Sequence, residues 1–240
     1  MKKLFAVAAI AAATISPALA LTTGDIAFTA FNADEDGWSL VTFVNIAANT
    51  QIFFSDSTAT NATTIGTGES SFSWSTGASM ISAGTVVRFS AIDVASRAAS
   101  VGTFVAVGTG NLGLSATTET VYAYLGTSAT SVTTMLSAVS TEANNSSLTT
   151  VGLTAGTNAI KLTSSTDFAG YIGARTGAAS FAAYAPLVNN AANWVINVGG
   201  NGTSVVPDTT VFAPIPEPGT YALLLAGLGV VGFVARRRQA

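Results

Sequence analysis

The sequence predicts an all-β protein: an antiparallel β-sandwich with one short helix, flanked by an N-terminal signal helix and a C-terminal transmembrane helix. Two observations favour the sandwich. Apolar, β-branched and aromatic residues form short runs, several of which alternate apolar and polar side chains. The segments between the runs are rich in Gly, Ser, Thr and Asn, and few of them show the helical period that βαβ units require.

The first 20 residues have the three parts of a secretory signal peptide. Lys2 and Lys3 supply a positive start, and residues 4–15 are apolar. Ala18 and Ala20 place small side chains at both recognition positions, so we expect cleavage after Ala20. As a helix, the 12 apolar residues would span roughly 18 Å, short of the ~30 Å hydrocarbon core, which argues against a permanent anchor.

Residues 21–200 are predicted to form one secreted β domain. The run at 71–75 has strict period two, with aromatic side chains on one face, and the other runs are β-branched or aromatic. We expect strands at residues 26–31, 40–46, 51–54, 71–75, 86–89, 103–107, 121–125, 159–162 and 193–196.

Three segments, at residues 46–50, 81–85 and 153–157, share the form apolar-x-Ala-(Asn/Gly)-Thr, and each precedes a predicted strand. Asn and Gly accept a left-handed backbone, so we expect a turn with positive φ at the fourth position. The spacings of 35 and 72 residues would also fit a duplicated unit. Because nothing else repeats at that period, repeated turn chemistry is the favoured interpretation.

One short helix is predicted near residues 181–188, where apolar side chains recur at helical spacing and Ser180 can act as the N-cap. Pro186 should break or kink it, because a proline inside a helix costs about 3 kcal/mol. A linker is expected over residues 201–213, where Pro207 and Pro214 interrupt the pattern.

Residues 214–240 form a distinct tail. Pro216-Glu217-Pro218-Gly219 precedes the uncharged residues 220–235, and Arg236, Arg237 and Arg238 follow directly. As a helix, those 16 apolar residues would span about 24 Å, a little under bilayer thickness, and the arginines would stop translocation. A helix buried in the core is a poor interpretation of this segment, because a core position would not explain three consecutive arginines directly after the apolar run at the end of the chain.

This tail resembles the PEP-CTERM sorting tail of Gram-negative bacteria, in which the three features occur in the same order. The resemblance implies export through the Sec translocon, cleavage by signal peptidase and transient anchorage in the inner membrane. An exosortase would then cut near the motif Pro216, Glu217, Pro218 and Gly219, with Arg236–Arg238 as the stop-transfer signal. The product would reach the cell surface or the medium, in bacteria that often make exopolysaccharide and biofilm. Separately, residues 24–34 resemble β domains of large bacterial surface proteins, and a lamin-tail-like or Ig-like sandwich is expected.

Composition excludes several function classes. Without Cys or His there is no disulfide framework, no thiolate or imidazole metal site and no Ser-His-Asp triad. Residues 21–213 hold four basic and 11 acidic side chains, a net charge of −7, so nucleic acid is not an expected partner.

The only acidic cluster lies at residues 32–37. Asn32, Asp34 and Asp36 match the first half of a calcium loop, but Phe43 occupies the position of the bidentate glutamate. A solvated hairpin turn with Asp36 and Gly37 at its tip is the favoured interpretation, and a weak calcium site is the alternative. No other metal or cofactor is expected.

Two further chemistries remain as alternatives. A carboxylate pair could hydrolyse glycosides without histidine, although the sequence gives no reason to bring two of the scattered acids together. Three tryptophans in or beside strands could form a sugar-stacking platform, although strand aromatics more often belong to the core. The acids are Asp56, Glu69, Asp93, Glu119 and Asp167, and the tryptophans are Trp38, Trp74 and Trp194.

These observations predict a secreted structural or adhesive protein of the cell surface or extracellular matrix that is not an enzyme and has no catalytic residues. A carbohydrate-binding module is the first alternative, with exopolysaccharide as its partner. A carboxylate-dependent hydrolase is the second.

Overall fold

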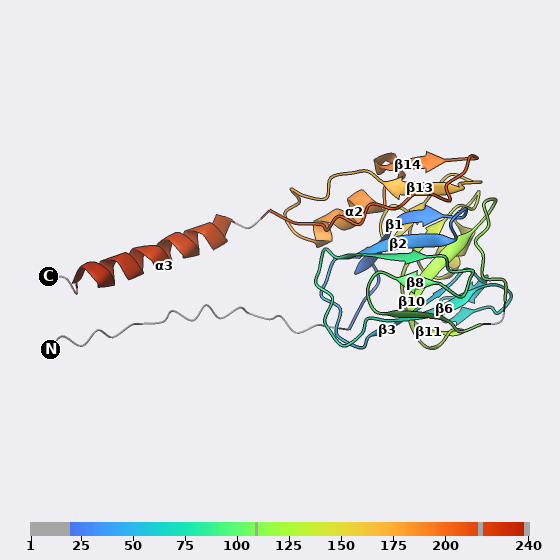
Figure 1. Cartoon of the computed structure of the whole chain (residues 1–240), viewed down its shortest axis with the longest axis horizontal. Helices are drawn as coiled ribbons and strands as arrows, with labels where there is room; N and C mark the ends of the chain where they lie inside the picture. Colours follow the sequence, from blue (N-terminus) through green and yellow to red (C-terminus); the bar gives the residue numbers. More distant parts are fainter. Residues whose placement is uncertain (1–19, 109, 216–217, 238–240) are drawn as a thin grey trace.

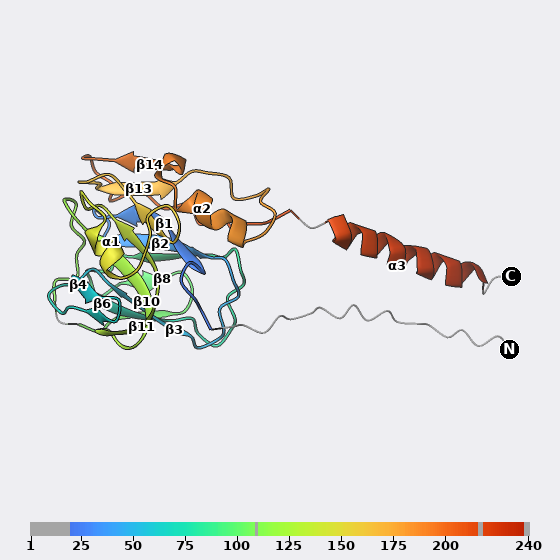
Figure 2. The ribbon, with the colours of Figure 1, turned by 180° about the vertical axis from the view of Figure 1, so that it is seen from behind.

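The computed structural model describes residues 20–108, 110–215 and 218–237. Residues 1–19 of the predicted signal segment, including Ala18, lie outside the described residues, and its last residue, Ala20, is the first one described. Two β-sheets face each other to form a sandwich, and a C-terminal helix stands apart from them (Figure 1). The view from behind shows the same two layers with short helices beside them (Figure 2).

The first sheet has six strands and is antiparallel throughout. Pairing begins with the hairpin between the first two strands in sequence, whose register joins Asn32 to Gly37. In spatial order the strands are β14 (Trp194–Asn197), β13 (Phe168–Tyr171), β1 (Ile26–Asn32), β2 (Gly37–Thr42), β7 (Val86–Ser90) and β8 (Ala98–Ala99).

The second sheet is centred on a long hairpin and includes one parallel strand at its side. In spatial order its strands are β4 (Ala59–Asn61), β5 (Thr64–Ile65), β11 (Ser131–Ser140), β10 (Thr120–Ser128), β3 (Gln51–Ser55), β6 (Ser71–Ser75) and β9 (Thr103–Ala106), and β12 (Ala159–Lys161) pairs in parallel with β11.

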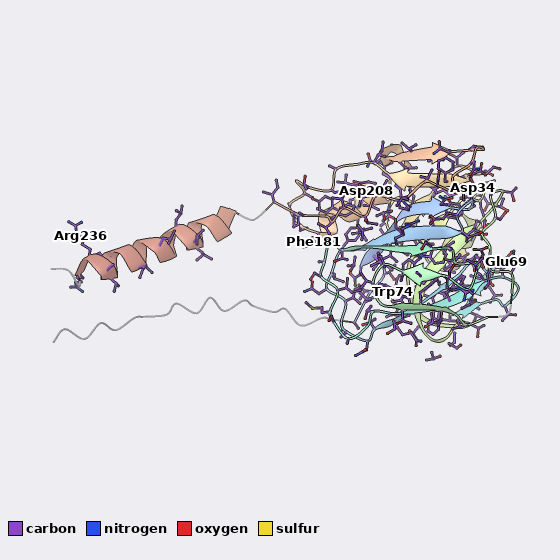
Figure 3. The ribbon with its side chains drawn as sticks, in the orientation of Figure 1. Asp34, Glu69, Trp74, Phe181, Asp208 and Arg236 are labelled. Carbon is purple, nitrogen blue, oxygen red and sulfur yellow. The ribbon has the colours of Figure 1, made fainter. Side chains whose placement is uncertain are left out.

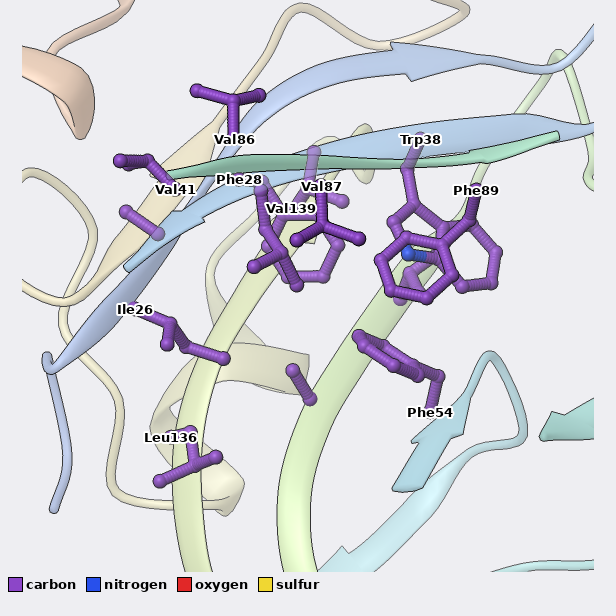
Figure 4. Packing of buried hydrophobic residues seen from close by; sticks show 14 of the residues in the cluster. Ile26, Phe28, Trp38, Val41, Phe54, Val86, Val87, Phe89, Leu136 and Val139 are labelled. Carbon is purple, nitrogen blue, oxygen red and sulfur yellow. The ribbon is translucent and has the colours of Figure 1, made fainter. Parts of the chain in front are cut away.

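The core lies between the two sheets, where side chains from both inner faces interdigitate (Figure 4). Trp38 of the first sheet illustrates this packing, because its ring centroid lies 5.3 Å from that of Phe54 in the second sheet and 5.7 Å from that of Phe89 in its own sheet. Phe54 and Phe89 are fully buried, and their centroids are 4.9 Å apart. The antiparallel sandwich predicted from the sequence is therefore confirmed.

Each run predicted to be a strand contains one. The run at 40–46 is placed least accurately, because β2 ends at Thr42. There the Thr42 hydroxyl donates a hydrogen bond of 2.6 Å to the carbonyl of Val44, and the chain bends at residues 43–44. The sequence analysis does not foresee β4, β5, β8, β11 and β13.

The recurring apolar-x-Ala-(Asn/Gly)-Thr segments are turns, as predicted. Their fourth residues all have positive φ: 57° at Asn49, 86° at Gly84 and 83° at Gly156. The strands that follow them are β3, β7 and β12. Repeated turn chemistry thus explains these segments.

The predicted short helix is present, but the break expected near Pro186 is not. A 3₁₀ turn, η1 (Ala182–Tyr184), runs directly into α2 (Ala185–Val188). Pro186 lies in the first turn of α2, where no amide donor is needed. The Ser180 hydroxyl accepts a hydrogen bond of 3.3 Å from the amide of Ala183. The sequence analysis does not foresee α1 (Ser146–Thr150) or η2 (Ala191–Asn193).

Candidate functional sites

The C-terminal tail forms the helix α3 (Pro218–Arg237). Pro218 and Gly219 of the predicted sorting motif open it, which suits proline because the first helical turn needs no amide donor. Arg236 and Arg237 lie in its last turn, and Arg236 is labelled in Figure 3. Pro216, Glu217 and Arg238 fall outside the described residues.

The apolar side chains of α3 from Leu223 onward are exposed; Leu223 is 76% exposed and Phe233 is 65% exposed. In the parts of the chain that the structure describes, no helix is long and apolar enough to cross a membrane. The predicted C-terminal helix is present. Its predicted role as a transmembrane span is not confirmed.

The segment before this helix, expected to be a linker, is held against the sandwich by Arg175. The Arg175 guanidinium forms an ion pair with Asp208, with 3.0 Å between Nε and Oδ2. It also donates hydrogen bonds to the carbonyls of Asp208 (3.1 Å) and Thr210 (2.9 Å). Hydrogen bonds from Thr210 lower the pKa of Asp208, and the charge of Arg175 lowers it further. Arg175 is 9% exposed, so its charge is compensated largely by this segment.

Phe212 is the apolar anchor of the same segment and is 2% exposed. Its ring centroid lies 5.0 Å from that of Tyr184 and 5.8 Å from that of Tyr171. The Arg175 guanidinium carbon lies 4.8 Å from the Phe212 ring centroid, within the range of a cation–π contact. The amide of Phe212 donates a hydrogen bond of 2.9 Å to the carbonyl of Gly84.

Backbone contacts extend this attachment to the end of the segment. The amide of Ala213 donates to the carbonyl of Arg175 (2.8 Å), and the amide of Ile215 donates to the carbonyl of Ala178 (2.9 Å). The Tyr184 hydroxyl also donates to the carbonyl of Ala213 (2.8 Å). The predicted sorting motif at 216–219 therefore begins one residue after the last of these contacts.

The acidic cluster at residues 32–37 is the predicted hairpin turn between β1 and β2. Asn32 is 2% exposed, and its Oδ1 accepts hydrogen bonds of 3.0 Å from the amides of Asp34 and Glu35. The turn consists of residues 33–36, because Gly37 pairs with Asn32 and opens β2, so the prediction that Asp36 and Gly37 form its tip is wrong. Asp36 is the last residue of the turn and has a φ of 54°. Glu35 forms an ion pair with Arg88 of β7.

The oxygens proposed as calcium ligands are used by the protein itself. Asp34 Oδ2 accepts a hydrogen bond of 2.5 Å from the amide of Gly202, and Asp36 Oδ1 accepts one of 2.5 Å from the amide of Leu114. Burial raises the pKa of Asp36, and the charges of Asp93 and Asp34 add to this effect. Within residues 20–108, 110–215 and 218–237, no three acidic side chains are grouped so that they could hold a metal ion. The turn explains this cluster without calcium.

Four acidic side chains line one polar cavity of about 310 Å³ at an edge of the second sheet. Asp56 follows β3, Glu69 lies just before β6, Glu119 directly precedes β10, and Glu142 follows β11. Because these four strands are antiparallel neighbours, these positions all fall at the same edge. We call this the carboxylate cavity. Glu69, one of its residues, lies at the end of the sandwich opposite α3 (Figure 3).

The two innermost carboxyl groups have strongly raised pKa values. Burial raises the pKa of Glu119 to about 8 and that of Asp56 to about 6. Glu69 raises both further by charge repulsion, and Asp56 does the same to Glu119. Glu119 is 7% exposed, and its oxygens accept hydrogen bonds from the amides of Ser115 (2.9 Å) and Thr120 (3.0 Å).

The cavity therefore brings together three of the five acids considered for hydrolysis: Asp56, Glu69 and Glu119. Asp93 and Asp167 do not line it. Glu142 is a residue that the sequence analysis missed. The sequence does show that acidic residues flank several predicted strands. The order of the strands in the sheet, which the sequence does not show, is what places these strand ends side by side.

The tryptophans belong to the core. Trp38, Trp74 and Trp194 are 1%, 0% and 6% exposed, so they offer no stacking surface for a sugar. The indole nitrogens of Trp74 and Trp194 each donate a hydrogen bond of 2.8 Å to a backbone carbonyl, that of Val101 and that of Val188. The favoured interpretation, that these strand aromatics belong to the core, is confirmed, and the alternative of a sugar-stacking platform at the three tryptophans is excluded.

Comparison with known proteins identifies the tail. The family model described as the PEP-CTERM protein-sorting motif matches residues 214–238. No curated protein and no solved structure matches the chain. The chain thus carries a PEP-CTERM sorting tail, which implies export, membrane-anchored sorting to the surface and an exosortase as the processing partner.

Proposed function

We propose that this chain is a secreted structural or adhesive protein of the bacterial cell surface or extracellular matrix. In this proposal a signal peptide directs export, and an exosortase cuts the tail near Pro216-Glu217-Pro218. The observation that carries the proposal is the sorting-motif match at residues 214–238, directly behind a folded β-sandwich. A processing enzyme would find the motif one residue beyond the last backbone contact of that domain, at Ile215.

The adhesive or structural part of the proposal is supported by composition and fold. The sequence has neither His nor Cys, which removes the commonest catalytic bases and nucleophiles. Its sandwich is rich in Ser, Thr and Asn, whose hydroxyl and amide groups can form many weak hydrogen bonds with polysaccharide or protein. We therefore infer that it acts by binding or by assembly.

Mass spectrometry of the protein recovered from cells and medium of an exosortase-containing host tests the proposal. We expect a mature product that begins at Leu21 and lacks the terminal residues 236–240. Glu217→Gln should reduce processing and retain the tail. Glu69→Gln changes an exposed acid outside the tail in the same way and should be processed like the parent. Recovery of residues 236–240 on the extracellular parent protein would contradict the processing proposal.

A carboxylate-dependent hydrolase is the second candidate, and the grouping of Asp56, Glu69 and Glu119 in one cavity favours it. In such an enzyme a protonated carboxyl donates a proton while an ionised neighbour acts as base or nucleophile. Glycan hydrolysis that is lost in Glu119→Gln would establish the hydrolase. A parent protein without hydrolytic activity on the host's own polysaccharides would remove it.

A further inference from the structure

The carboxylate cavity groups four acidic side chains with no basic side chain among its described lining residues. It is lined by Asp56, Glu69, Glu119 and Glu142, and no lysine or arginine in the described chain lines it. Lys161 approaches from outside, but its ammonium donates to the backbone carbonyls of Glu142 and Leu162. Like charges held in a partly buried site repel one another, which makes the cavity receptive to a cation.

Asp56 supplies an independent sign that the cavity can take a hydrogen-bond donor. The residue is 5% exposed and lines the cavity. Its Oδ1 atom is buried and accepts no hydrogen bond from any described residue. An unpaired acceptor of this kind destabilises the folded protein, and does so more when it is charged. A donor brought by a ligand would remove that destabilisation.

The remaining lining groups restrict which cation fits. No three acidic groups among the described residues are placed to hold a metal ion, which argues against calcium. Hydroxyl groups line the cavity beside the carboxylates, among them those of Thr120, Tyr122 and Ser147. Thr120 Oγ1 donates to Glu142 Oε1 (3.1 Å) and can accept from the Ser147 hydroxyl, whose Oγ lies 3.1 Å away, so the hydroxyls and carboxylates form one network.

We propose that the carboxylate cavity binds a primary ammonium group carried on a polyhydroxylated ligand, of the class of a deacetylated amino sugar. The ammonium group donates to the carboxylates, including Asp56, and the ligand hydroxyls exchange hydrogen bonds with the threonine, serine and tyrosine hydroxyls. The cavity volume of about 310 Å³ lies at the lower end of the range for small-molecule sites. Glu69, which lines the site, lies at the end of the sandwich opposite α3 (Figure 3).

Calorimetry on the full chain with four probes tests the proposal. Glucosamine carries both the ammonium group and the hydroxyls, N-acetylglucosamine keeps the hydroxyls, putrescine keeps the ammonium group, and calcium chloride supplies a metal cation. We expect glucosamine to bind one to one and to raise the unfolding temperature. The other three should bind at least about tenfold more weakly, because each lacks one set of charge-assisted or neutral hydrogen bonds.

Variants separate a binding role from a structural one. Asp56→Asn should weaken glucosamine binding about tenfold while leaving the ligand-free unfolding temperature unchanged or higher, because it removes an uncompensated buried charge. Asp93→Asn is the matched control, since Asp93 is exposed and does not line the cavity. It should change neither property. Glu69→Gln, at an exposed lining position, should fold like the parent and weaken glucosamine binding severalfold.

Several outcomes would overturn the proposal: equal binding of putrescine or calcium, no binding of glucosamine, or undiminished glucosamine binding in both cavity variants. An Asp56→Asn protein with a lowered unfolding temperature would assign the carboxylate a structural role instead. None of these results bears on tail processing. The proposed sorting function is tested separately, by mass spectrometry of the processed protein.

Discussion

Gly84 is the residue at which a turn of the sandwich meets the segment leading to the tail. Its φ is 86°, and a Cβ there would lie 2.2 Å from the Phe212 carbonyl oxygen and 2.6 Å from Cε1 of Phe181. Gly84→Ala should therefore reduce the free energy of unfolding by about 2–4 kcal/mol, from backbone strain plus steric overlap. Chemical denaturation of the purified protein measures this loss.

Gly156 provides the matched control, because it has a similar φ of 83° in the same kind of turn and nothing within 4 Å of a Cβ. Gly156→Ala should lose only the conformational part, about 1–2 kcal/mol. Equal losses in the two variants would mean that steric overlap with Phe212 adds nothing to the loss of free energy of unfolding in Gly84→Ala.

The raised pKa values of Glu119 and Asp56 predict that stability depends on pH. A carboxyl group whose pKa is higher in the folded protein stabilises it fully below the unfolded pKa, and this stabilisation disappears as pH rises through the folded pKa. For Asp56 that window runs from about 4 to about 6, and for Glu119 from about 4.5 to about 8.

The free energy of unfolding should therefore fall between pH 5 and pH 9, by an amount on the order of 2 kcal/mol. Urea titrations across this range measure it. Asp56→Asn should flatten the part of the curve below pH 6, and the exposed control Asp93→Asn should not. A parent curve that rises from pH 5 to pH 9 would be incompatible with buried, repelling carboxyl groups.

Among the elements, the anchored segment, residues 208–215, is the one whose contribution to stability can be tested most directly. Phe212→Ala removes a ring that is 2% exposed and packed on Tyr171 and Tyr184. Large-to-small changes of this kind cost about 3–5 kcal/mol. Hydrogen exchange should accelerate at the amides of 212, 213 and 215, which now donate to the sandwich.

Val211→Ala is the control for this prediction, since Val211 is 56% exposed and adjacent in sequence. It should leave the exchange rates of those amides unchanged. If Phe212→Ala also leaves them unchanged, the polar contacts of Arg175, Tyr184 and the backbone hold the segment without the ring.

How far the sequence predicts an element depends on whether its cause is local. The left-handed turns at Asn49, Gly84 and Gly156 were predictable, because short-range backbone preferences decide them. The strand β11 was not, although it is ten residues long. Its alternation is irregular, and its pairing with β10, β12 and β5 provides the hydrogen bonds that define it.

At the scale of the whole molecule, the sandwich class and the sorting tail follow from sequence patterns, but the carboxylate cavity does not. Glu119 and Glu142 lie on either side of the longest hairpin, and Asp56 and Glu69 flank a second pair of strands. Their proximity results from the order β11-β10-β3-β6, which depends on long-range pairing. No spacing along the chain encodes that order.

The position of the domain boundary is a property of the whole molecule that truncation can test. A chain ending at Ile215 keeps the Arg175 ion pair, the buried Phe212 and the last backbone contacts. It should unfold at the same temperature as the longer chain, because the described apolar side chains of α3 are exposed rather than packed on the sandwich. A chain ending at Pro207 should unfold at a clearly lower temperature, since it loses the buried Phe212 ring, a loss that costs about 3–5 kcal/mol. Calorimetry of the two truncated chains measures the difference. If the chain ending at Pro207 were as stable as the one ending at Ile215, residues 208–215 would contribute nothing to the stability of the domain. An exosortase would then reach its motif on an unattached segment rather than at the surface of a folded domain.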